Sequence, residues 1–390
     1  MSKAIRLDSD QQTADRAQDG LGRPQSEPFD LSRWLTDQAL PLWLEAGHAS
    51  KTRIAEEALD FEGRSAGLAI TRLRVQARQI YVFARASHEG LGTAYANRAE
   101  ELFEGLLEHG WLDHGGFVHT LARSGGPQET MRDLYDHAFV LFALAWYYRA
   151  SGEPAALKWA EKTQGFIDSA MRGSAGPGYL ETPEGLLPRR QNPHMHLFEA
   201  YLALYEATGD ARWLDRATEL FGLFVCHVWD RRTGLINEFF DAEWGIETPQ
   251  GRPPFEAGHH FEWVWLLSEY QRLKGEDISF VIRRAFNTAM RIGRDADGFA
   301  TDYMDRTGPV GTSRRLWPQA ELIRALKLFR PSDAEIMQDK LGRTYLATPQ
   351  SGLWFDRIED GVNVAPNVPA STLYHLAGLV WDCHSAATSN

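Results

Sequence analysis

One helical-hairpin pattern recurs along this chain and constrains its fold more than any other feature. In each copy an apolar helix ends at a glycine, a short polar turn follows, and an amphipathic helix begins. The clearest copies span residues 142–167, 199–224 and 264–289, with Gly152, Gly209 and Gly275 at their turns, 57 and 66 residues apart. Glycine at a helix end adopts the left-handed conformation that closes the last turn. An acidic residue beside it favours the start of the second helix.

Further copies extend the pattern to both ends of the chain. Gly92 lies 60 residues before Gly152, and a weaker turn near Arg330 follows Gly275 by 55. Helices expected at 31–47 and 370–382 would pair as a sixth unit. Periods of this length indicate an array of supersecondary units. The first helix of each pair is apolar on nearly all sides, as in a buried helix, and the second is striped, as in a surface helix. The sequence therefore predicts an all-α fold, a closed (α/α)6 barrel; an open solenoid is the alternative, and the complementary chain ends favour closure.

Composition limits the remaining possibilities. Residues 1–28 are polar without an apolar run, which predicts a disordered tail rather than a signal peptide or anchor, followed by one barrel domain over 29–390. No segment has 18 consecutive apolar residues, so no membrane span is expected. The net charge of -12 argues against nucleic acid and anionic membranes as partners. Cys226 and Cys383 lie in apolar settings, which predicts buried thiols and a cytoplasmic protein; a monomer or a homodimer is expected.

The connections between helices alternate in length. The turns inside each pair are short, whereas long loops lead from each outer helix to the next inner one, and several of these read as short β-hairpins. They span 115–126, 176–193, 233–254, 297–311 and 351–367. Because the connectivity alternates, all of them emerge at one end of the barrel. Long loops on a rigid scaffold usually carry the functional site.

The first turns of the expected inner helices are unusually polar. A single histidine in an apolar helix indicates a buried structural residue, but polar groups at the same end of six helices predict a central pocket. The group comprises Arg74, Arg78, Tyr135, Asp136, His137, Asn192, His194, His196, Glu199, His259, His260, Glu262, Trp317, Gln319, Glu321 and His375. His196 with Glu199, and His259 with Glu262, are each three residues apart and share a helix face. His260 points away from the face that His259 and Glu262 share, and it could equally be a structural histidine.

Several chemistries fit such a pocket. A metal centre built on His-x-x-Glu pairs reverses the order seen in helical bundles, and the zinc-protease His-Glu-x-x-His pattern is absent. Glycoside hydrolysis would use two carboxyl groups, Glu262 with Glu321 or Asp136 with Glu199. Neither a phosphate-binding glycine loop nor a Gly-x-Ser-x-Gly elbow occurs. The many histidines favour proton transfer beside a sugar carbonyl through a cis-enediol, with Arg78 stabilising charge on oxygen. This chemistry requires neither a metal nor another cofactor.

Five motifs in order resemble the N-acylglucosamine 2-epimerase superfamily, most closely its mannose isomerase branch, from about residue 30 to 383. They are RLRVQARQIYVF, NPHMHLFEAYLAL, EAGHHFEWVWLL, RLWPQAE and TLYHL. The resemblance implies an (α/α)6 barrel, His259 and His375 as catalytic histidines, and Glu262 as the carboxylate partner of His259. The resemblance also implies substrate-binding roles for Arg78, Tyr135, Asn192, His196, Arg252, Trp317 and Glu321. Glu199 of the polar ring is expected to bind substrate as well. One departure is Ala257 where N-acyl sugar epimerases often have proline.

The resulting expectation is an aldose–ketose isomerase that interconverts D-mannose and D-fructose, with D-lyxose and D-xylulose as side substrates. His375 would move the proton between C2 and C1, and His259 with Glu262 would assist ring opening and proton transfer between O1 and O2, although the two histidines could exchange roles. The nearest alternative is a 2-epimerase acting on mannose and glucose. More distant alternatives are a glycoside hydrolase and a non-catalytic protein that binds a sugar or a partner protein.

Overall fold

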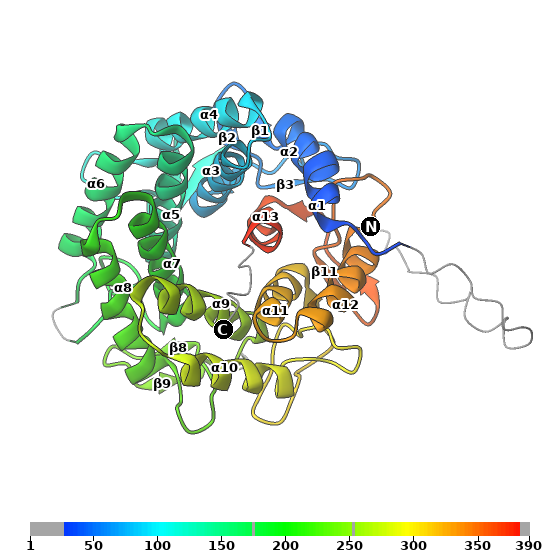
Figure 1. Ribbon diagram of the computed structural model, residues 1–390. Helices are drawn as coiled ribbons and strands as arrows, with labels where there is room; N and C mark the ends of the chain where they lie inside the picture. Colours follow the sequence, from blue (N-terminus) through cyan, green and yellow to red (C-terminus); the bar gives the residue numbers. More distant parts are fainter. Residues whose placement is uncertain (1–26, 174–175, 252–253, 383–390) are drawn as a thin grey trace, which may run out of the picture.

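The computed structural model describes residues 27–173, 176–251 and 254–382, which form two concentric rings of helices (Figure 1). The expected tail 1–28 lies outside the described residues except for its last two positions. Arg252 and Cys383 also lie outside them. Among the described residues, no helix is long and apolar enough to cross a membrane.

The inner ring is closed. Its members are α3 (Leu73–His88), α5 (Leu134–Ser151), α7 (Gln191–Thr208), α9 (Ala257–Lys274), α11 (Leu316–Phe329) and α13 (Leu373–Trp381). Each helix packs on the next, and α13 packs on both α11 and α3, which joins the two ends of the series. The closed barrel is therefore confirmed over the open solenoid.

Each inner helix has an outer partner. The outer ring consists of α4 (Thr93–Gly110), α6 (Pro154–Ala170), α8 (Ala211–Leu223), α10 (Ser279–Ile292), α12 (Pro331–Leu341) and the irregular helix from α1 (Leu31–Trp34) through η1 (Leu35–Ala39) to α2 (Leu40–Ala46). The pair formed by α13 and this N-terminal helix confirms that the two ends of the barrel supply the sixth unit.

The hairpin turns form as the glycine pattern predicts. Gly152, Gly209 and Gly275 follow α5, α7 and α9 with φ angles of 71°, 69° and 74°, and the N–H of each closes the last turn of its helix. Next to two of these glycines, the side chains of Glu153 and Asp210 accept hydrogen bonds from the first turns of α6 and α8. The local sequence thus ends one helix and starts the next within a few residues.

Small antiparallel sheets cover one end of the barrel. Three loops form the hairpins β5 (Thr120–Ala122) with β6 (Pro127–Glu129), β8 (Phe239–Phe240) with β9 (Ile246–Glu247), and β11 (Arg357–Glu359) with β12 (Val362–Asn363). Each hairpin pairs with a strand that runs directly into an inner helix: β4 (Ile70–Arg72), β7 (Arg189–Arg190) and β10 (Arg314–Arg315). Two further pairs join β1 (His48–Ala49) to β2 (Ile54–Ala55), and β3 (Ala58–Leu59) to β13 (Val368–Pro369). The sheets therefore attach the loops to the starts of the inner helices.

Buried polar side chains reinforce this attachment in a repeating way. Four residues after the N-cap of its helix, each of His137, His194 and His260 accepts a hydrogen bond from a loop N–H through Nε2 and bonds the N-cap carbonyl through Nδ1. Gln76 and Gln319 accept a loop N–H at the same position in α3 and α11. Four of these residues, His137, His194, His260 and Gln319, belong to the predicted polar ring, and Gln76 does not. All five hold the loops, so their role is structural.

One prediction about the cysteines is wrong. Cys226, on the outer face after α8, is exposed to solvent rather than buried. Its neighbours Val225 and Val228 are apolar, but the surface-helix stripe places Cys226 on the solvent side.

Candidate active site

A cavity of about 330 Å³ opens at the loop end of the barrel axis. Of the residues expected from the sequence, the following line it: Arg74, Arg78, Tyr135, Asn192, His196, His259, Glu262, Trp317 and His375. Most of them occupy two helical positions. Counted from the residue that caps each inner helix, Tyr135, Asn192 and Trp317 are second, and Arg78, His196 and Glu262 are sixth. His375 is likewise sixth after Pro369, which caps the short turn before α13.

His259 and His375 face the same cavity on two sides of one tryptophan. The ring centroid of Trp317 lies 5.3 Å from that of each histidine. Gly258 makes room for this ring, because a Cβ atom there would lie 2.3 Å from the outer edge of the indole. The two histidines, 116 residues apart in sequence (375 minus 259), therefore meet at one hollow.

His259 is held as a cation by a carboxylate that the sequence did not reveal. Its Nδ1 lies 3.0 Å from Oε2 of Glu238, a buried residue just before β8. Burial alone would lower the pKa of His259, but the charges of Glu238, Glu256 and Glu262 outweigh it and raise the pKa to about 10. Glu262, the partner expected from the motif, adds to the charge that raises this pKa, but among the described residues it forms no hydrogen bond with His259.

His375 is held in the opposite protonation state. Its Nδ1 pairs with Oε1 of Glu321 at 2.7 Å, and Arg324 donates to the other oxygen of Glu321 at 2.8 Å. Burial is the main reason why the pKa of His375 falls to about 4, against the attraction of Glu321. At neutral pH the cavity therefore presents one charged and one neutral imidazole. Environments that push two pKa values apart in this way separate an acid from a base.

Two glutamates expected to bind substrate lie behind histidines instead. Glu321 does so behind His375, and Glu199 pairs with Nδ1 of His196 at 2.9 Å, as the sequence predicted for that pair. Neither glutamate lines the cavity. Burial raises the pKa of Glu199 to about 7, while burial and the charge of Arg78 keep His196 neutral by lowering its pKa. These carboxyl groups orient imidazoles and do not line the cavity.

Glu262 completes the floor of the cavity. One of its oxygens lies 3.8 Å from Nε2 of His196 and has no hydrogen-bond partner among the described residues. Burial, then repulsion by Glu321 and Glu199, raises the pKa of Glu262 well above its usual value. Glu262, Glu321 and His375 place ligand atoms within 4.8 Å of one another, close enough to hold a metal ion. Arg324, which donates to Glu321, would oppose a cation there.

Hydrogen-bond donors and acceptors line the rest of the wall. Arg78 donates to the hydroxyl of Tyr135 at 3.1 Å, and its guanidinium lies 4.1 Å from the centroid of the Phe139 ring. Among the described residues, no carboxylate forms an ion pair with Arg78. Asn192 also lines the cavity, and its buried amide oxygen has no hydrogen-bond partner among the described residues. These groups are free to bind hydroxyl and carbonyl oxygens.

Three other arginines at the cavity are already neutralised. Arg72 pairs with Glu57 at 2.6 Å, Arg74 with Asp136 at 3.1 Å, and Arg315 with Glu256 at 2.9 Å. Asp136 also binds His119 at 2.6 Å and is fully buried, so it takes no part in a carboxylate pair with Glu199. Arg315 and Glu256 line the cavity and were not predicted, although they are the first residues of the motifs RLWPQAE and EAGHHFEWVWLL and cap inner helices.

Comparison with known proteins agrees with this geometry. A family model described as N-acylglucosamine 2-epimerase (GlcNAc 2-epimerase) matches residues 56–378. The chain belongs to this family. The family assignment makes the protein an isomerase or epimerase of sugars.

Three of the known proteins that resemble this chain cover 75% to 93% of it. A mannose-6-phosphate isomerase of Rhizobium meliloti (strain 1021) is 32% identical over 374 residues, 90% of this chain and 95% of the relative. A cellobiose 2-epimerase of Bacteroides fragilis is 26% identical over 325 residues, 75% of this chain and 79% of the relative. A crystal structure of D-mannose isomerase superposes with a TM-score of 0.81 at 20% identity, over 93% of this chain and 99% of that one, which supports the fold.

Proposed function

We propose that this member of the epimerase family is an aldose–ketose isomerase that interconverts D-mannose and D-fructose, with D-lyxose and D-xylulose as side substrates. One observation carries the proposal: His259 and His375 line one cavity, and each bonds a buried glutamate through Nδ1, which leaves its Nε2 for the sugar. A cofactor-free isomerase requires a base for carbon and an acid for oxygen, both available at the same pH.

The proposed reaction starts from the open-chain sugar. Neutral His375 removes the proton from C2 through Nε2, and the electron pair forms the C1–C2 double bond while the carbonyl oxygen O1 takes a proton from charged His259. His375 then returns its proton to C1, O2 gives its proton to His259, and the ketose forms. Arg78 donates hydrogen bonds to the oxygens that gain negative charge. His196 would do so through Nε2 as the tautomer whose Nδ1 accepts from protonated Glu199. Protonated Glu262, beside His196, would assist ring opening.

The charges at the cavity favour an unphosphorylated sugar. The Rhizobium relative is named for a sugar phosphate, which requires cations free to bind it. Here Arg72, Arg74 and Arg315 each contact a carboxylate, and a phosphate would have to displace those partners. The remaining arginine that lines the described part of the cavity, Arg78, is flanked by the rings of Phe139 and Tyr374, with centroids 4.1 and 4.9 Å away.

A 2-epimerase is the second candidate. Charged His259 carries a proton that it would deliver to the opposite face of C2, which would give glucose from mannose. The similarity to the Bacteroides relative, which is named as a cellobiose 2-epimerase, supports this second candidate. The two reactions share the removal of the C2 proton by His375. In the epimerase His259 would keep its proton during this step while Arg78 binds the enediolate oxygen, and His259 would then give the proton to C2 as the C1 carbonyl forms again.

The test is to follow D-mannose by NMR in D2O with the purified protein, with and without EDTA. The proposal expects fructose as the first product, deuterium at carbon positions C1 or C2, and no effect of EDTA. Glucose before fructose would support the epimerase instead. Sugar binding without turnover or exchange would reject both and indicate a binding protein. His375→Asn should abolish the exchange, and full activity in this variant would overturn its role as the base.

A further inference from the structure

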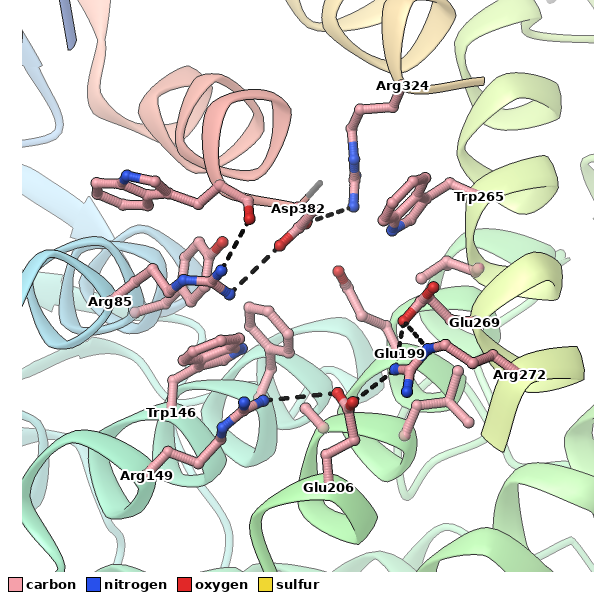
Figure 2. A pocket seen from close by; sticks show the side chains of 16 residues that line it. Arg85, Trp146, Arg149, Glu199, Glu206, Trp265, Glu269, Arg272, Arg324 and Asp382 are labelled. Atoms are coloured by element: carbon pink, nitrogen blue, oxygen red, sulfur yellow. Dashed lines mark hydrogen bonds and ion pairs between the residues drawn. The ribbon is translucent and has the colours of Figure 1, made fainter. Parts of the chain in front are cut away.

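A second cavity, of about 190 Å³, lies at the opposite end of the barrel and is lined by the C-terminal halves of the inner helices (Figure 2). Its wall includes Arg324 of α11 and Asp382, the residue that follows α13. Arg324 donates to one oxygen of Asp382 at 2.8 Å, and Arg85 donates to the other at 3.3 Å. In Figure 2, Asp382 lies between the two guanidinium groups.

Arg324 also reaches toward the sugar cavity. Its second terminal nitrogen donates to Glu321 at 2.8 Å, and Glu321 pairs with Nδ1 of His375 at 2.7 Å. A continuous chain therefore runs from His375 through Glu321 and Arg324 to Asp382. His375, Glu321 and Arg324 are almost completely buried, and the Asp382 side chain is 21% exposed at the second cavity. Buried charges interact much more strongly than exposed ones, because water screens them less.

We propose that Arg324 is a positioning residue for the reaction: it shares the charge of Glu321 and so keeps His375 free of a proton, and Asp382 holds it there from the second cavity. This inference rests on the proposed role of His375 as the base. It goes beyond that role, because it assigns a function to two residues that do not contact the sugar cavity.

The physical reason is competition for one carboxylate. Glu321 accepts from both His375 and Arg324, and burial opposes its charge, but Arg324 foremost and then His375 lower its pKa below the usual value. Without the guanidinium, Glu321 and His375 would face each other alone, and the pair would take up a proton at higher pH, whichever group carried it. The base would then be lost near neutral pH.

Charged and titratable groups from four helices face His375. They are Arg78 of α3, His196 of α7, Glu262 of α9, and Glu321 and Arg324 of α11. The substitutions proposed below leave all of these in place except Arg324 itself. A change in the titration of His375 would therefore report on the Arg324 charge.

The experiment is an NMR titration of His375 in protein with 13C-labelled histidine, without sugar. Arg324→Met should raise the pKa of His375 by on the order of one unit or more, and Arg324→Lys should keep it near the wild-type value. Asp382→Asn should leave it at or below the wild-type value, because the asparagine amide oxygen still accepts from Arg324 and holds it, while Arg324 acts on Glu321 with its full charge. Arg272→Met is the matched control: Arg272 lines the same cavity, but it pairs with Glu206 and Glu269 and should change nothing.

Two results would overturn the proposal. One is an Arg324→Met protein in which His375 titrates as in the wild type. The other is an Asp382→Asn protein in which the pKa of His375 rises, since that would indicate disturbed packing rather than charge. If Arg324→Met does not fold, Asp382→Asn decides the question by the same criterion. The acid limb of kcat/KM for mannose is measured separately; if it does not follow the NMR shift, the positioning stands and the role of His375 as base fails.

Discussion

His259 and Glu238 form a buried ion pair between the start of α9 and the loop before it, with Nδ1 and Oε2 3.0 Å apart. Gln191 donates to the same carboxylate oxygen at 3.0 Å, and the backbone N–H of Glu256 donates to the other at 3.2 Å. A buried carboxylate with several donors stays ionised and keeps its histidine charged. The geometry occupies Nδ1 and leaves Nε2 of His259 for the cavity.

Removal of this carboxylate charge should narrow the pH range of activity. In Glu238→Gln the pKa of His259 should fall from about 10 toward the ordinary value of about 6.5, so the histidine loses its proton at lower pH. We expect the alkaline limb of kcat/KM for mannose to move to lower pH, with a loss of roughly 10²-fold at pH 9. Glu247→Gln, at an exposed position on β9, is the control. An unchanged alkaline limb would show that His259 does not act as a cation.

The same pair should make stability depend on pH. The folded-state pKa of His259 lies above its unfolded value, so its contribution is fully present below about pH 6.5 and is lost as the pH rises through about 10. The difference in unfolding free energy between wild type and Glu238→Gln should therefore shrink from pH 6.5 to pH 10. Urea denaturation at both pH values measures it. An equal difference at both would contradict the assignment of charge to His259.

The place of Trp317 between the two histidines depends on a glycine. Gly258→Ala would put a Cβ atom 2.3 Å from the indole edge and 3.1 Å from Pro318, so the ring must move. We expect kcat/KM to fall by on the order of 10²-fold, because displacement of a site wall by about 1 Å has effects of this size. Gly222→Ala, in α8 with open space around it, should keep full activity. Full activity in Gly258→Ala would show that the position of Trp317 is not critical.

His260 should matter for stability and not for chemistry. His260→Ala leaves the buried N–H of Ile236 without its partner and should lower the free energy of unfolding by about 1–3 kcal/mol. His260→Gln should cost less, since Gln319 makes the same contact to Ala300 in α11. Urea denaturation and mannose turnover measured on the same samples separate the two effects. Loss of turnover in a stable His260→Gln protein would contradict this assignment.

Much of the fold was predictable because its repeat is local. The glycine that ends an apolar helix and the acidic residue that caps the next helix lie within a few residues of each other. Gly152 closes α5 and Glu153 caps α6 through contacts to neighbouring residues alone. Closure also followed from the sequence, because the helices at the two chain ends lacked partners. The exposure of Cys226 was missed since apolar neighbours do not show which side of an outer helix a residue takes.

The candidate site was predictable only in part. The motifs identified His259 and His375, but the residues that set their charge come from elsewhere: Glu238 lies in a loop whose path no helical spacing predicts. The sequence also did not separate residues that face the axis from those that hold the loops, such as His260. That distinction depends on the residue that caps each helix, and the cap positions became clear only in the structure. The sequence predicts that Glu199 and Glu321 bind the substrate. In the structure each lies behind a histidine and does not line the cavity.

The proposed mechanism requires that, of the two imidazoles beside one cavity, His259 is charged and His375 is neutral. The direct measurement is 15N NMR of the histidine side chains of the wild-type protein at pH 7, with His259→Gln and His375→Gln for assignment. We predict that His259 shows the signature of a protonated ring and His375 that of a neutral ring with its proton on Nδ1. If both rings are neutral, or both protonated, the separation of acid from base is contradicted.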